Sequence, residues 1–121
     1  MTNKITLVLG ASSNTERYSY KAVQSLLRHK HEVFAVGLKP DVIFNIPILI
    51  SIPEIEELDT ISLYLGPKNQ IPYYDEIIKL RPRRVIFNPG TENSELEDLL
   101  KTNSIAFEES CTLVLLATGQ F

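Results

Sequence analysis

The sequence has little cysteine, no tryptophan and no strong charge of either sign. A single cysteine, Cys111, excludes an internal disulfide framework and a metal site built from several thiolates. Twelve basic residues stand against fifteen acidic ones, so the formal net charge of −3 gives no general attraction to nucleic acid or to an anionic membrane. The sequence also lacks a signal peptide and any apolar run near the length of a membrane span. We therefore expect a cytoplasmic protein with neither nucleic acid nor a membrane as a partner.

The length and the composition are those of an ordinary globular domain. The chain has 121 residues, of which 44% are hydrophobic and 22% are charged. No internal repeat and no linker rich in glycine or serine divides it. Residues 1–121 are therefore predicted to form one domain.

Short apolar runs alternate along the chain with longer amphipathic segments. The runs predict five strands, at residues 5–9, 32–36, 60–65, 84–88 and 105–109. The segments between them predict helices at residues 18–30, 73–80 and 94–101, a helical turn at 51–54, and an apolar closing segment at 112–116. Strands that alternate with helices form a parallel sheet with right-handed crossovers. The predicted fold is a doubly wound α/β domain with a mainly parallel, five-stranded sheet.

The ligand of such a sheet binds beyond the carboxyl ends of the strands. Five loops are predicted at that edge, namely Gly10–Ser13, Gly37–Pro40, Leu65–Pro67, Asn88–Thr91 and Ser110–Thr112. In the first loop, glycine allows a close approach of the backbone and two serines offer hydroxyl groups. The N-terminus of the next helix presents free N–H groups beside Arg17. These features favour a phosphate or diphosphate group.

The end of the second predicted strand gives information on the ligand. Proteins that bind NAD usually place an aspartate or glutamate there, which accepts hydrogen bonds from the ribose. This chain has Gly37, Leu38 and Lys39 at that point, and no acid before Asp41. A lysine favours a phosphorylated ribose, as in CoA or NADP. The alternative interpretation of Lys39 is a solvated surface lysine.

Few residues are candidates for catalysis. Cys111 follows the last predicted strand, where a thiol of lowered pKa would be a nucleophile and an ordinary one would be a buried packing residue. His29 and His31 are predicted at the opposite end of the sheet. The acidic residues near position 94 match the N-terminus of the helix that starts there. No set of nucleophile, base and orienting residue is found, so we expect neither a catalytic residue nor a metal site.

The chain resembles a known family in several of its segments. These are "LVLGASSNTERYSYKAV", "VFAVGLKP", "DTISLYLGP", "VIFNPGTENSELEDLLKTNSI" and "ESCTLVLLATGQF". They are similar to the small CoA-binding, Rossmann-like domain proteins and to the N-terminal domain of the succinyl-CoA synthetase α subunit. With the five strands numbered along the chain, the resemblance implies the order 3-2-1-4-5. The segment 43–47 departs from the family because it lacks a glycine, and the synthetase's second domain, with its phosphorylated histidine, has no counterpart here.

The resemblance also implies roles for individual residues. Those that would face the diphosphate are Gly10, Ala11, Ser12 and Arg17. Lys39 would lie toward the phosphate of the adenosine ribose, and Leu65 and Pro67 would border the adenine. Asn88, Pro89 and Gly90 would line a channel to the pantetheine arm. The same loops add Ser13, Gly37 and Cys111 to the predicted cofactor-binding set.

Two functions follow from these features. The first is non-catalytic binding of coenzyme A or acyl-CoA through the adenine-nucleotide moiety. The alternative is an NADP-binding or acyl-transfer enzyme, or a subunit of one, that uses Cys111 together with a partner protein. The apolar segment Leu113–Leu116 is expected to pack on the sheet, with a homodimer or a partner enzyme as the alternative occupant of its surface.

Overall fold

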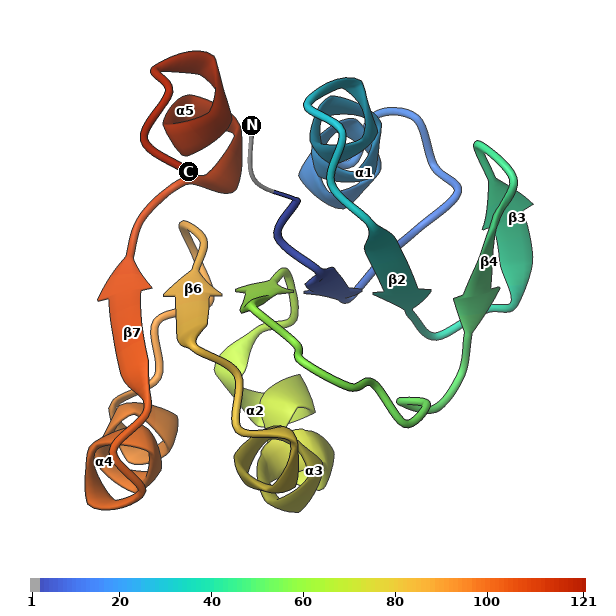
Figure 1. Ribbon diagram of the computed structural model, residues 1–121. Helices are drawn as coiled ribbons and strands as arrows, with labels where there is room; N and C mark the ends of the chain where they lie inside the picture. The colour runs from blue at the N-terminus through green and yellow to red at the C-terminus, as the bar shows by residue number, and fades with distance from the viewer. Residues whose placement is uncertain (1–2) are drawn as a thin grey trace.

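The computed structural model describes residues 3–121 and contains one sheet of seven strands with helices on both faces (Figure 1). The strand order is β3-β4-β2-β1-β5-β6-β7, and every neighbouring pair is parallel except β3 with β4. The strands are β1 (Thr6–Leu9), β2 (Val33–Val36), β3 (Asp41–Ile43), β4 (Ile46–Leu49), β5 (Thr60–Leu63), β6 (Arg84–Phe87) and β7 (Ala106–Glu109). The helices are α1 (Tyr18–Arg28), α2 (Pro67–Gln70), the 3-10 helix η1 (Ile71–Tyr73), α3 (Tyr74–Leu80), α4 (Ser94–Thr102) and α5 (Thr112–Ala117).

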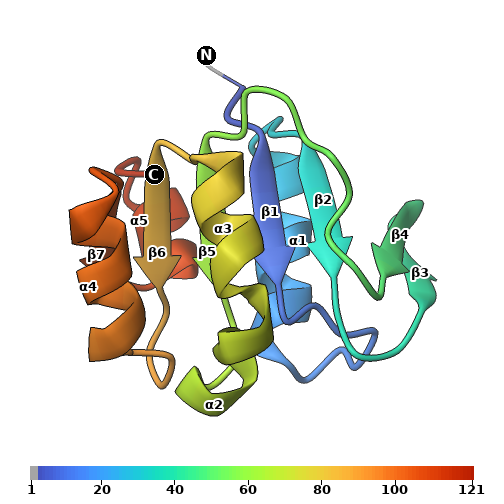
Figure 2. The same ribbon diagram turned by 90° about the horizontal axis from the view of Figure 1, so that it is seen from below.

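Two apolar layers hold the helices on the sheet. All four residues of β1 are buried, and their side chains alternate between the two faces. Leu7 and Leu9 pack into the layer that contains residues of α3 and α4, whereas Val8 packs into the layer below α1 and α5. Figure 2 shows α3 and α4 on the near face, with α1 and α5 behind the sheet. The mainly parallel α/β architecture was thus predicted correctly.

The sheet has seven strands because a short hairpin, β3–β4, extends it beyond β2. The prediction of five strands was therefore wrong. The turn of this hairpin contains no glycine, and Phe44 and Asn45 adopt positive φ angles of 51° and 64°. Asparagine tolerates this conformation, whereas phenylalanine rarely adopts it. The Phe44 ring packs against Tyr20 of α1, with 5.0 Å between the ring centroids.

The position of the third predicted strand also differs. The order 3-2-1-4-5 placed residues 60–65 beside the second strand, but β5 pairs with β1 on the side away from β2. The position beside β2 is taken by β4, in which Ile48 lies opposite Ala35. The chain reaches it through the adjoining hairpin, so no long crossover is needed.

One other segment differs from its predicted local structure, and the closing segment, for which no element was predicted, is helical. The turn predicted at 51–54 is not helical, and the irregular segment there packs Ile52, Ile55 and Leu58 against the core. The closing segment at 112–116 forms α5, which lies beside α1. The helices predicted at 18–30, 73–80 and 94–101 are present within a few residues of those bounds.

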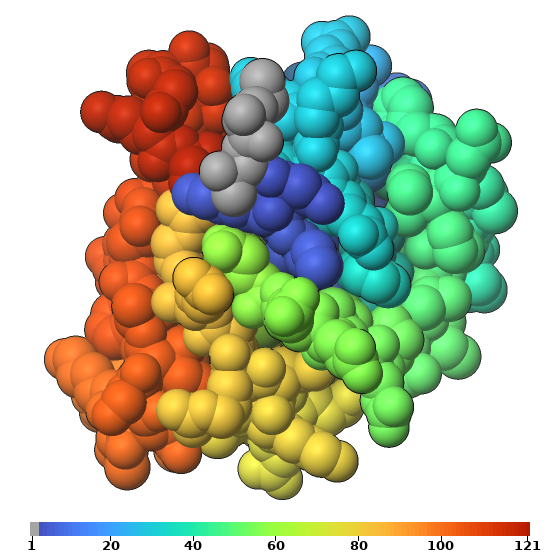
Figure 3. All heavy atoms as spheres, in the orientation of Figure 1, coloured from blue at the N-terminus to red at the C-terminus, as the bar shows by residue number. Residues whose placement is uncertain are grey.

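The amino ends of the central strands lie together on one face (Figure 3). The backbone N–H group of Thr60 donates to the backbone oxygen of Ile5, and the backbone N–H group of Arg84 donates to the backbone oxygen of Asp59.

Among residues 3–121, no helix is both long and apolar enough to cross a membrane.

The sheet ends at β3, where a carboxylate bonds to the strand's own backbone. The Asp41 side chain accepts a hydrogen bond from the N–H group of Val42 at 2.7 Å. This bond, together with the hydroxyl of Ser13, lowers the pKa of Asp41 below its ordinary value. On the inner side of the hairpin, Val42 lies opposite Pro47, which has no N–H group.

Candidate functional site

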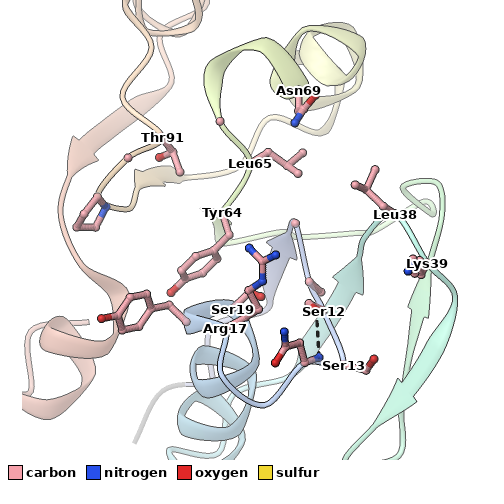
Figure 4. A pocket seen from close by; sticks show the side chains of 17 residues that line it. Ser12, Ser13, Arg17, Ser19, Leu38, Lys39, Tyr64, Leu65, Asn69 and Thr91 are labelled. Atoms are coloured by element: carbon pink, nitrogen blue, oxygen red, sulfur yellow. Dashed lines mark hydrogen bonds between the residues drawn. The ribbon is translucent and has the colours of Figure 1, made fainter.

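A pocket of about 730 Å³ lies beyond the carboxyl ends of β1, β2, β5 and β6 (Figure 4). This is the edge where the sequence predicted the site. The predicted residues that line it are Gly10, Ala11, Ser12, Ser13, Arg17, Lys39, Leu65, Pro89 and Gly90. Those that do not line it are Gly37, Pro67, Asn88 and Cys111. Four loops that are distant in the sequence thus form one concave surface.

The turn after β1 forms the floor of the pocket. The N–H groups of Gly10 and Ala11 both donate to the backbone oxygen of Val36, at 2.8 and 2.9 Å. Gly10 has a φ of +102°, and a side chain there would meet the backbone of Tyr64 at 2.9 Å. Only glycine therefore lets the turn lie this close to the end of β5.

The turn leads into the N-terminus of α1. The Ser12 hydroxyl oxygen accepts a hydrogen bond from the N–H group of Asn14 at 3.0 Å, drawn dashed in Figure 4. Within residues 3–121 its own hydrogen has no acceptor, so it is free to donate. Arg17 precedes the helix, no side chain caps the first turn, and the guanidinium extends into the pocket in Figure 4. Hydroxyl, helix dipole and guanidinium together make this end of the pocket suitable for an anion.

Apolar side chains from two loops face each other across the pocket. Leu38 follows β2 and is 77% exposed, whereas Leu65 follows β5 and is nearly buried. Figure 4 shows these two side chains on opposite sides of a gap, with Asn69 of α2 beside it. Lys39 lies next to Leu38 on the β2 side. Among residues 3–121, neither Lys39 nor Arg17 forms an ion pair. The pocket therefore combines an apolar slot with two cationic groups.

Gly37 and Asn88 have other roles in the structure than lining the pocket. A side chain at Gly37 would lie 2.1 Å from the backbone oxygen of Ala11, so the glycine lets the first turn rest on the end of β2. Asn88 is buried and turned inward, where its amide donates to Ser62 at 2.9 Å and to the backbone of Leu63 at 2.8 Å. Its amide oxygen accepts from the N–H group of Thr112 at 2.8 Å. Both residues support the walls.

The cysteine and the histidines are not part of the pocket. Cys111 is half-buried and precedes α5, and it does not line the pocket. His31 lies near the amino end of β1, where its Nδ1 atom accepts from the N–H group of Lys4 at 2.9 Å. Burial and the nearby Lys4 charge lower the pKa of His31 below its ordinary value. Within residues 3–121, no group of histidine, cysteine and acidic side chains is arranged to hold a metal ion.

Sequence reasoning missed several residues that line the pocket. They are Asn14, Tyr18, Ser19, Leu38, Tyr64, Gly66, Asn69 and Thr91. Most of them lie within or beside the predicted loops, so a wider reading of each loop would have included them. Tyr64 is the least ordinary, because its hydroxyl is buried and has no hydrogen-bond partner among residues 3–121. Burial raises the pKa of Tyr64 to about 12.

The chain is similar to known proteins in both sequence and fold. The sequence profile of a family described as the CoA binding domain matches residues 4–117. No curated protein is similar enough in sequence to count as a match.

Solved structures with the same fold are known. A crystal structure of an uncharacterized protein has 46% sequence identity and a TM-score of 0.96, with all of both chains covered. A Thermus thermophilus protein has 22% identity and a TM-score of 0.87, over 98% of this chain and 91% of the other. A hypothetical protein from Pyrococcus horikoshii has 26% identity and a TM-score of 0.80, over 91% of this chain and 78% of the other.

Proposed function

Because the chain belongs to the CoA-binding domain family, we propose that the pocket binds coenzyme A or acyl-CoA through its adenine-nucleotide moiety, without catalysing a reaction. One observation carries the proposal. The turn at Gly10–Ser13, the Arg17 guanidinium and Lys39 all line a single pocket. A ligand that spans it meets anion-binding groups at two separate places.

The pocket suggests how the ligand is arranged. The diphosphate lies over the first turn, where Ser12 donates its hydroxyl hydrogen and Arg17 supplies positive charge. Lys39 faces the phosphate on the adenosine ribose, and the adenine lies between Leu38 and Leu65. The loop that contains Pro89 borders the pantetheine arm. Direct ligand contacts from Gly37, Pro67, Asn88 and Cys111 stay predictions from the sequence.

A binding role is favoured over an enzymatic one by the side chains at this edge. The acyl-transfer alternative requires a nucleophile in the pocket, and Cys111 does not line it. The Tyr64 phenol, with a pKa of about 12, is protonated at neutral pH and does not serve as a base. The NADP alternative uses the same phosphate-binding features and is separated from CoA binding by experiment.

Calorimetric titration with CoA, dephospho-CoA, NADP and NAD tests the proposal. We expect CoA to bind most tightly, because only CoA offers the ribose phosphate to Lys39 together with a pantetheine arm. Lys39→Ala should weaken CoA binding by about fivefold and leave dephospho-CoA unaffected, since an exposed ion pair contributes up to about 1 kcal/mol. Lys79→Ala, on the exposed face of α3, is the matched control. Millimolar CoA that produces neither heat nor thermal stabilisation would refute the proposal.

A further inference from the structure

Gln70 is a completely buried polar residue at the end of α2. Its side-chain amide nitrogen donates two hydrogen bonds, to the backbone oxygens of Leu65 and Thr91, each at 2.8 Å. Its amide oxygen accepts a third from the side chain of Asn93, also at 2.8 Å. Both donor positions of the amide are therefore used inside the protein.

The two backbone oxygens belong to different walls of the pocket. Leu65 lies in the loop after β5, and Thr91 lies in the loop after β6; both residues line the pocket. Among residues 3–121, no other hydrogen bond joins residues 64–70 to residues 89–91. One amide thus connects the two walls directly, whereas Asn88 joins the strand ends behind them through Ser62 and Leu63.

The other end of each bond is also held in place. Thr91 donates through its N–H group and its hydroxyl to the backbone oxygen of Asn88, at 3.0 and 2.8 Å. Asn93 donates to the Tyr74 hydroxyl as well as to Gln70, and its own oxygen caps α4. The connection therefore extends from the pocket wall to α3 and α4, so the wall residues are fixed relative to the rest of the fold.

We infer that Gln70 is a positioning residue, which sets the separation between the Leu65 wall and the Thr91 wall and so keeps the pocket ready for its ligand. The inference rests on the proposed function. A pocket that is ordered in advance binds more tightly, because the ligand does not have to order the loops. In the described part of the chain, residues 3–121, no other side chain makes these two donations.

Two substitutions of similar size remove the donations in different ways. Gln70→Met removes all three hydrogen bonds and introduces no charge. In Gln70→Glu, a carboxylate stands opposite the two backbone oxygens and repels them. Burial and this repulsion raise the pKa of the new carboxyl group above that of an ordinary glutamate. Once protonated, this carboxyl group donates one hydrogen bond again. Gln120→Glu is the matched control, because Gln120 is exposed and lies after α5.

The affinity for CoA is measured by calorimetry across a pH series and expressed relative to wild type, so that titration of the ligand cancels. We expect both variants at Gln70 to bind about tenfold more weakly at alkaline pH. The deficit should shrink for Gln70→Glu as the pH falls and stay constant for Gln70→Met. Leu100→Ala removes a buried side chain of α4 away from the pocket, and it should lower the melting temperature without weakening binding.

The outcomes separate the inference from the proposed function. Wild-type protein that does not bind CoA overturns both. If wild type binds and the Gln70 variants stay within about twofold of it, only the inference falls. The inference is also refuted if Leu100→Ala weakens CoA binding as much as the two Gln70 variants do. It is refuted as well if the loss of CoA affinity in Gln70→Glu does not change with pH.

Discussion

Replacing Gly37 with alanine should disturb the pocket through one contact. The added Cβ would lie 2.1 Å from the backbone oxygen of Ala11, and 3.2 Å from a side-chain carbon of Ile48. To restore an ordinary contact, the Ala11 carbonyl has to move by roughly 1 Å. The φ of Gly37 lies outside the left-handed region, so no backbone strain adds to this clash. The substitution therefore tests how closely the first turn is held against β2.

The size of the effect follows from the bonds that this movement stretches. The N–H groups of Gly10 and Ala11 share the backbone oxygen of Val36, at 2.8 and 2.9 Å. Each bond contributes about 0.5–1.5 kcal/mol, and overpacking adds about 1–3 kcal/mol. We expect a total loss near 3 kcal/mol, which lowers the melting temperature by roughly 12 °C in a chain of this length. CoA binding should weaken as well, because the displaced turn forms the pocket floor.

Thermal denaturation followed by circular dichroism measures this loss. Gly66→Ala is the matched control, since an added Cβ meets no atom within 4 Å and φ is −64°. Its melting temperature should stay within about 2 °C of wild type. If Gly37→Ala were equally harmless, the close packing of the turn on β2 would not be holding the pocket together, and the argument from this contact would be wrong.

Three further results are expected. His31 must be neutral for its Nδ1 atom to accept the hydrogen bond from the N–H group of Lys4. Because the pKa of His31 is lowered in the folded protein, the unfolded chain binds more protons below about pH 6.5, and the free energy of unfolding should fall as the pH drops through that range. His31→Gln should flatten this dependence of the melting temperature on pH in thermal denaturation. Asn93→Ala should be about 1 kcal/mol less stable in urea than Asn93→Ser, whose uncharged hydroxyl still caps α4; equal stabilities would refute this role of the cap. Tyr64→Phe removes a buried hydroxyl that forms no well-aligned hydrogen bond within residues 3–121 and should stabilise the protein by about 1 kcal/mol, whereas a loss of stability would show that the nearby Ser62 or Thr112 hydroxyl bonds to it.

The parts of the fold that could be predicted are those in which burial requires a recognisable pattern of apolar residues in the sequence. The run at 5–9 is apolar because β1 is covered on both faces, and the stripe of α4 is apolar because one side packs on the sheet. The hairpin β3–β4 leaves no such pattern. Two of the three residues of β3 are exposed, and the turn is held by the contact of Phe44 with Tyr20, which is far away in sequence.

The site was predictable as a set of loops and less so as a set of side chains. Parallel strands bring their carboxyl ends to one edge, so the loops at Gly10, Lys39, Leu65 and Pro89 had to meet there. Whether a side chain within a loop faces the pocket or the core depends on local hydrogen bonds. Asn88 turns inward because buried donors and acceptors surround it, and one sequence does not contain that information.

The carboxylate of Asp41 has a consequence for association between molecules. An open sheet border invites another chain to add a strand, and this is a common route to aggregation. Here the outward N–H group of Val42 is already satisfied by a charged group, and at the far border β7 carries Glu108 and Glu109. Since the pKa of Asp41 is lowered, its charge persists into mildly acidic solution. A dimer that continued the sheet across β3 would first have to displace this carboxylate.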